Sequence, residues 1–295
     1  MSAIALNATH GSTVIAAHGT RDTAGVAVAQ ELVVALCDRL PGRQVLLAFV
    51  DVLGPGVREV LAAAPGPVTV VPAFLTSGYH VRTDVPREIA ATGRRDVTVT
   101  AALGPDPLLV NALADRLRVA GWCRGDAVVL AAAGSSDPRA VADVRAAAAA
   151  LSGTVGRRVR VGFIATGVPR VEPLVAGLRA AGERRIAVAS WLLAPGLFHR
   201  RLASAGADVV AAPLGIHPGV IDRLAQLATA AEVWTDTAPI ETSIADLGAT
   251  RQITATATSV RPWVNRSRDS SGCGTHPHWS ALRRRSSLDT IVYSG

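Results

Sequence analysis

Short apolar runs that end in glycine, proline or a polar residue constrain the fold of this chain more than any other feature. They occupy residues 12–17, 44–50, 68–74, 97–103, 127–132, 158–165 and 185–192, and stretches with helical periodicity separate most of them. Continuous apolar runs of this length are typical of strands buried on both faces of a parallel sheet. Strands that alternate with helices through short loops predict an α/β fold with doubly wound parallel sheets.

The two halves of this pattern repeat each other. The segment VIAAHGTRD at 14–22 aligns with VLAAAGSSD at 129–137, VLLAFVDVLGP at 45–55 with VRVGFIATGVP at 159–169, and VVPAFLTSG at 70–78 with VASWLLAPG at 188–196. The offset stays between 114 and 118 residues, so few insertions separate the copies. We therefore expect two tandem domains of the same fold, at 12–122 and 126–234.

Three polar side chains follow apolar runs of the first copy: His18, Asp51 and His80. Ligands of open α/β sheets bind outside the carboxyl ends of the strands, so we expect these side chains to share one edge of the sheet. Two neutral imidazoles and a carboxylate suit a divalent first-row metal and leave coordination positions open for chemistry. An imidazole also accepts protons near neutral pH.

The second copy lacks these groups. Ala133 aligns with His18, Ala165 with Asp51 and Phe198 with His80, and His199 lies one place beyond the equivalent of His80. The sequence therefore predicts one site per chain, in the first domain. The second domain is expected to form the other wall of a cleft.

The chain is basic, with a formal net charge of +7, and all its basic side chains are arginines. These arginines form no stripe with interleaved aromatic residues, which disfavours a nucleic-acid partner. A small polycarboxylate fits better, because the arginine fork matches carboxylates. No apolar run reaches the ~18 residues that cross a bilayer, and the first residues lack a signal-peptide pattern. We expect a cytoplasmic protein without a membrane partner.

The last part of the sequence has a different composition. Residues 235–295 are rich in threonine, serine and arginine and have no sustained apolar face, so we expect a disordered tail. Cys273, His276 and His278 lie there without a second ligand pair at zinc-site spacing, and we interpret them as incidental. The three cysteines of the chain are far apart, which predicts neither a disulfide framework nor a CxxC metal site.

Three motifs resemble one enzyme family. HGTRD at 18–22, FVDVLGP at 49–55 and VPAFLTSGYHVRTDVP at 71–86 are similar to motifs of the sirohydrochlorin chelatases and the related cobaltochelatases, the class II tetrapyrrole chelatases. The resemblance covers both copies. It implies a lyase that inserts Fe²⁺ or Co²⁺ into sirohydrochlorin, for siroheme or cobalamin biosynthesis. The metal is then a substrate, and no permanently bound cofactor is implied.

The resemblance also implies roles at the predicted site. His18 and His80 would bind the metal or accept the pyrrole protons, and Asp51 stands where relatives carry an acidic residue. Asp22 and Asp84 are further candidates to assist, although both fit a turn or helix-cap role equally well.

The polycarboxylate substrate implies a second set of residues. Arg21 and Arg82 flank the histidines in sequence and are expected to bind acetate and propionate groups. Ser77 and the backbone near Gly78 are expected to line the cleft. Arg87, Arg200 and Arg201 are further arginines that could reach the substrate.

The sequence is also compatible with two other functions. A non-catalytic metal or tetrapyrrole carrier could use the same histidine pair, and a structural α/β module could retain a degraded site. The sequence does not choose between iron and cobalt, because imidazole suits both. It gives no oligomeric state.

Overall fold

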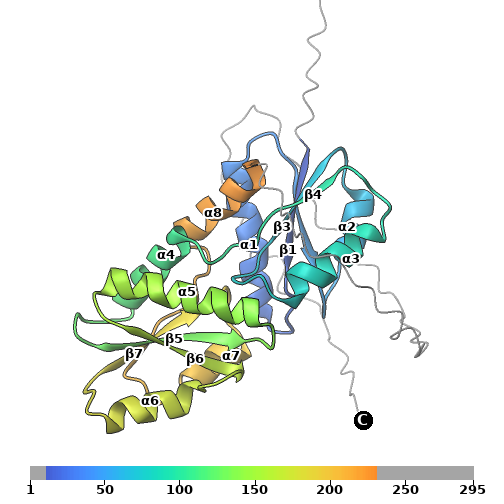
Figure 1. The fold of residues 1–295 in the computed structure, drawn as a ribbon. Helices are drawn as coiled ribbons and strands as arrows, with labels where there is room; N and C mark the ends of the chain where they lie inside the picture. The colour runs from blue at the N-terminus through green and yellow to red at the C-terminus, as the bar shows by residue number, and fades with distance from the viewer. Residues whose placement is uncertain (1–10, 231–295) are drawn as a thin grey trace, which may run out of the picture. The chain divides into compact units, whose positions relative to one another are not determined.

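The computed structural model describes residues 11–230 of the 295-residue chain, so the predicted tail with Cys273, His276 and His278 lies outside the described part. Two four-stranded parallel sheets confirm the expected α/β class (Figure 1). The first has the strand order β2-β1-β3-β4 and the second the matching order β6-β5-β7-β8. The strands are β1 (Ser12–Ala17), β2 (Val45–Phe49), β3 (Val68–Pro72), β4 (Val97–Val99), β5 (Ala127–Gly134), β6 (Val159–Thr166), β7 (Ile186–Trp191) and β8 (Val209–Val210).

Helices cover both sheets. They are α1 (Thr23–Arg39), α2 (Val57–Ala63), the π-helical turn η1 (His80–Asp84), α3 (Val85–Ala90), α4 (Pro107–Val119), α5 (Pro138–Val155), α6 (Val171–Ala180), α7 (Leu197–Leu202) and α8 (Pro218–Thr229). The elements α7, β8 and α8 are not among those that the sequence pattern predicts. Within the described chain, no helix has the length and apolar character needed to cross a membrane.

The repeat is visible in matching local contacts. Thr20 Oγ1 accepts from the Asp22 N–H and Asp22 caps α1, while Ser135 Oγ accepts from the Asp137 N–H and Asp137 caps α5. After the second strand of each sheet, a loop returns to form one isolated parallel bridge, Phe49 with Gly56 and Phe163 with Arg170. Equal caps and bridges at equal positions show that the copies share their loop geometry as well as their strands.

Two helices, α4 and α8, each pack against the sheet of the other copy rather than the sheet that they follow in sequence. Helix α4 follows the first sheet in sequence but packs against β7 and α5 of the second copy. Helix α8 follows the second sheet but packs against α1 and β3 of the first, and Figure 1 shows it beside α1. Ion pairs join Arg39 of α1 to Asp222 of α8, and Arg223 of α8 to Asp106 ahead of α4. One buried apolar cluster consequently runs through both copies.

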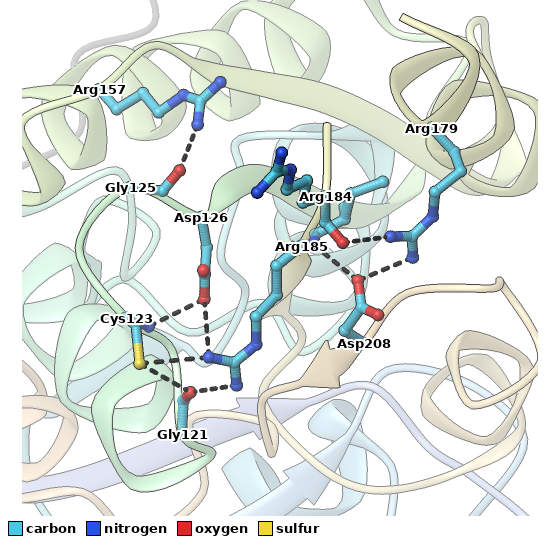
Figure 2. A network of polar contacts seen from close by, with 10 residues as sticks. Gly121, Cys123, Gly125, Asp126, Arg157, Arg179, Arg184, Arg185 and Asp208 are labelled. Atoms are coloured by element: carbon cyan, nitrogen blue, oxygen red, sulfur yellow. Dashed lines mark hydrogen bonds and ion pairs between the residues drawn. The ribbon is translucent and has the colours of Figure 1, made fainter. Parts of the chain in front are cut away.

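A polar network fixes the amino-terminal edge of the second sheet (Figure 2). Asp126 Oδ2 accepts from the Cys123 N–H at 2.9 Å and lies 3.6 Å from Arg185 Nη1. Asp208 accepts from the Ile186 N–H at 2.8 Å, and this bond is the main cause of its lowered pKa. These contacts hold the starts of β5 and β7, at the edge opposite the carboxyl ends. The exposed Cys123 and the half-buried Arg185 therefore have structural partners in this network.

Candidate metal centre

His18 is the first residue after β1, and a close approach of two backbones fixes its position. Gly19 packs against the loop after β2, where a Cβ atom on residue 19 would lie 2.0 Å from the Asp51 carbonyl oxygen. Only glycine permits this contact without movement. The sequence His18-Gly19 thereby brings the end of β1 and the loop after β2 together.

Asp51 lies in a strained turn after β2. The Leu53 N–H donates to the Asp51 carbonyl at 2.7 Å, and Val52 between them has φ 65°. A β-branched residue at positive φ is a backbone outlier that costs on the order of 1–3 kcal/mol, and such outliers cluster at functional sites. Asp51 Oδ1 lies 3.0 Å from His18 Nδ1, yet this buried oxygen has no hydrogen-bond partner among the described residues. It is an acceptor that a cation could use.

His80 reaches the same place by a longer path than the sequence indicates. Strand β3 ends at Pro72, and a loop leads to His80 at the start of η1. The ring centroid of His80 lies 5.0 Å from that of His18 and 5.9 Å from that of Phe74, which stacks on it. Its Nδ1 bonds to Asp84 Oδ2 at 2.7 Å. The structure thus brings the three predicted residues together, although His80 does not end a strand.

The trio forms a compact set of metal-ligand types. His18, Asp51 and His80 each offer one ligand atom, and these atoms all lie within 4.8 Å of one another. Burial lowers the pKa of His18 from 6.5, the Asp51 carboxylate opposes that shift, and the neighbouring His80 adds to it. A lowered pKa keeps the His18 imidazole neutral at physiological pH, as metal binding requires.

A cavity of about 360 Å³ opens beside the trio. Its lining is mostly apolar and comes from both copies. Residues that line it include Ala17, His18, Phe74, Leu75, Thr76, Ala132, Ala133, Phe163, Trp191, Leu193, Phe198 and His199. His199 Nε2 lies 3.3 Å from the Ala211 carbonyl, and His199 is not part of the ligand cluster. A mostly apolar lining with a few polar groups is typical of a small-molecule binding site.

Among residues 11–230, the ligand cluster contains no residue of the second copy. Ala133 and Phe198 line the cavity without a coordinating group. The guanidinium of Arg170, which stands where the first copy has Gly56, donates to the carbonyls of Ile164 and Ala165. An arginine side chain therefore satisfies two backbone carbonyls at the end of β6, whereas Gly56 at the aligned position of the first copy has no side chain to do so.

The predicted substrate-binding residues take varied positions. Arg21 is exposed and lines a second, open cavity of about 590 Å³ together with Arg200. Arg82 lies on η1 and is partly exposed. The Ser77 N–H donates to Asp143 of α5 at 2.7 Å, which joins this loop to the second copy. The Gly78 carbonyl accepts from the N–H groups of residues 81 and 82.

Sequence reasoning missed several residues that shape the site. Phe74 stacks on His80, Asp143 accepts from the Ser77 N–H in the loop before it, and Trp191 of the second copy lines the cavity. Arg200 and Asp22 were both expected from the sequence, but their pairing was not; that hydrogen bond is the main cause of the lowered pKa of Asp22. The motif VPAFLTSGYH contains Phe74, but the partners from the second copy have no local signal in the sequence.

Comparisons with known proteins agree with this geometry. The CbiX family model matches residues 12–120 and, a second time, residues 127–231. No curated protein matches. Among solved structures, SirB from Bacillus subtilis with Fe³⁺ has a TM-score of 0.63 and 21% identity, covering 75% of this chain and 95% of that one. The sirohydrochlorin chelatase SirB from Bacillus subtilis subspecies spizizenii in complex with cobalt has a TM-score of 0.60 and 20% identity, covering 75% and 94%.

A third structure is CbiX, described as the terminal enzyme for biosynthesis of siroheme in denitrifying bacteria. Its TM-score is 0.56 at 22% identity, with 73% of this chain and 96% of that chain covered. At these identities the structures show a shared fold. The family match is independent of them and spans both copies, which confirms the family resemblance of the three motifs: the chain belongs to the CbiX family.

Proposed function

We propose that this chain is a chelatase that inserts Fe²⁺ or Co²⁺ into sirohydrochlorin. The observation that carries the proposal is the cluster of His18, Asp51 and His80, with ligand atoms within 4.8 Å of one another beside an apolar cavity. Membership of the CbiX family supports the reaction class. The SirB structures with Fe³⁺ and with cobalt support the choice of metals.

The reaction exchanges two pyrrole protons of the macrocycle for one divalent cation. Two N–H bonds break, the nitrogen lone pairs bind the metal, and a base must take the protons. A neutral His18 can hold the metal or accept a proton, because its lowered pKa favours the uncharged imidazole. The unpartnered Asp51 Oδ1 adds a negative ligand that balances part of the metal charge. His80 provides the second imidazole.

The cleft suits a flat polycarboxylate. The face of the macrocycle would lie on the apolar lining, and its acetate and propionate groups would reach outward to Arg21 and Arg82. Ser77 and Gly78 would lie along its edge. Arg200 already pairs with Asp22, so a substrate carboxylate would compete with that aspartate. In this proposal residues 12–122 supply the chemistry, 126–234 supply the opposite wall, and the reaction takes place in the cytoplasm.

Absorbance of the metallated product tests the function directly. The purified chain is mixed with sirohydrochlorin and either Co²⁺ or Fe²⁺, and the rate is compared with the reaction without protein. His18→Ala and His80→Ala should each abolish the acceleration. His217→Asn is a matched control, because His217 caps α8 through its side chain and asparagine is also a good cap.

Each outcome decides between functions. Acceleration that requires both histidines supports a chelatase, and the faster metal identifies the preferred ion. Binding of metal and tetrapyrrole without acceleration would make the protein a carrier. Absence of both would make it a structural module and overturn the proposal.

A further inference from the structure

The two histidines of the metal centre each face a carboxylate, but the two carboxylates differ in their surroundings. Asp51 Oδ1 lies near His18 Nδ1 without hydrogen-bond geometry, and the Asp51 side chain is 39% exposed. Asp84 Oδ2 makes a hydrogen bond to His80 Nδ1 at 2.7 Å, and its side chain is only 10% exposed. One carboxylate is accessible to a metal, and the other is held within the protein.

The π-helical turn η1 creates the second contact. The Val85 N–H bonds to the His80 carbonyl, five residues back, so residues four apart lie nearly above one another. This wider turn places the Asp84 carboxylate directly at His80 Nδ1. Such single π turns occur frequently at functional sites.

Asp84 is held from its other side as well. Arg87 Nη2 lies 2.8 Å from Asp84 Oδ1, so each carboxylate oxygen has a charged or polar partner. Asp84 occupies the cap position of α3, but its side chain makes no capping hydrogen bond. The Asp84 carboxylate therefore does not act as a helix cap. Phe74 stacks on the face of His80 and restrains its ring plane.

From this geometry we infer that Asp84, anchored by Arg87, is a positioning residue that keeps the proton of His80 on Nδ1 and leaves the Nε2 lone pair for the metal. A carboxylate that accepts from the remote nitrogen of a metal-binding histidine fixes both tautomer and ring orientation. The inference rests on the proposed function only in that His80 is taken as a ligand. Asp51 and Asp84 then have different roles: Asp51 contacts the metal, and Asp84 acts through its hydrogen bond to His80.

The tautomer can be measured without any catalytic assay. Long-range ¹H–¹⁵N spectra of the full metal-free chain at mildly alkaline pH report which ring nitrogen carries the proton, and a His80→Gln variant assigns the signals. We expect the Nδ1–H form in the wild type. In Asp84→Ala the Nε2–H form should gain population. A wild-type signal of the Nε2–H form would overturn the inference even if no variant folds.

Metal affinity gives the second readout. Titration with Co²⁺ alone should give a Kd that is about 10–100-fold higher for Asp84→Ala than for the wild type. This is the usual effect of removing the hydrogen-bond partner of a metal-binding histidine. Asp84→Asn, which keeps the shape and can still accept from Nδ1–H, should recover part of that affinity. Asp51→Ala should weaken Co²⁺ binding without changing the His80 tautomer. Unchanged Co²⁺ affinity in Asp84→Ala would contradict the inference.

Asp96→Ala is the matched control, because Asp96 also pairs with an arginine, Arg94, but precedes β4 at the opposite edge of the sheet. It should leave both the tautomer and the Co²⁺ affinity unchanged. A chain that lacks chelatase activity yet shows the Nδ1–H tautomer and the Asp84-dependent affinity would refute the proposed function alone. Chelatase activity together with a His80 tautomer that is the same in the wild type and in Asp84→Ala would refute this inference alone.

Discussion

Gly19→Ala should damage the metal centre although the substitution adds a single methyl group. The new Cβ would lie 2.0 Å from the Asp51 carbonyl oxygen and 3.0 Å from the Leu53 nitrogen. Carbon–oxygen contacts are normally about 3.3 Å or longer, so the end of β1 and the loop after β2 must separate by more than about 1 Å. Both sides of the clash are backbone, and neither can yield by a rotamer change.

The expected magnitude follows from that displacement. Overpacking of this kind costs about 1–3 kcal/mol of stability, or roughly 2–12 °C in Tm for a protein of this size. A misplacement of about 1 Å at a reacting group can lower the rate about 100-fold. Because the contact involves the Asp51 backbone directly, Co²⁺ affinity should fall about tenfold or more. Calorimetric Co²⁺ titration and thermal unfolding measure the two effects separately.

The second copy provides the control. Gly134 has φ 98°, and a Cβ there would lie 1.7 Å from the Thr166 carbonyl oxygen. Gly134→Ala should therefore destabilise the protein at least as much. It should leave the affinity for Co²⁺ alone intact, since no described residue of that copy belongs to the ligand cluster. Wild-type Co²⁺ affinity in a folded Gly19→Ala protein would refute the reasoning. Equal loss of affinity in both variants would show that stability, and not the local contact, controls binding.

Three further predictions follow from local contacts. Because burial lowers the pKa of His18, the unfolded chain binds a proton at this residue more readily than the folded chain, so stability should decline as pH falls from 6.5 through the folded-state pKa. Thermal unfolding in a pH series measures this, and a His18→Ala variant with the same decline would contradict it. Arg200→Ala should return the pKa of Asp22 upward toward its ordinary value, as a carboxyl ¹³C titration would record; an unchanged pKa would exclude the ion pair. Gly177→Ala in α6, where a Cβ meets open space, should stabilise the protein by about 1 kcal/mol, and a lower Tm would disprove it.

The sequence predicts the strands well because the relevant signals are local. The run at 12–17 coincides with β1, and the other expected strands overlap β2 to β7. Glycine and proline mark where each element stops, and buried parallel strands need uninterrupted apolar runs. His18 directly follows β1 and Asp51 lies two residues beyond the end of β2, so their shared edge was predictable from the order of elements.

Other features depend on contacts between distant segments. His80 approaches the centre through a loop and η1, and the hydrogen bond of its Nδ1 to Asp84 depends on a π turn that the sequence pattern does not indicate. The exchange of α4 and α8 has no local signal either. Both helices begin with a capping residue and a proline. These local signals predict where each helix begins but do not indicate which sheet it packs against.

The sequence by itself determined the alternation of strands and helices, the duplication, and the absence of His or Asp at the second-copy positions 133, 165 and 198, which align with His18, Asp51 and His80. Tertiary structure decided that Asp51 Oδ1 has no hydrogen-bond partner among the described residues whereas Asp84 is held by Arg87, and that Arg170 binds the Ile164 carbonyl in the second copy. The physical reason is that apolar periodicity and turn residues act over a few positions. The environment of a polar group, by contrast, is set by whichever distant segments pack around it.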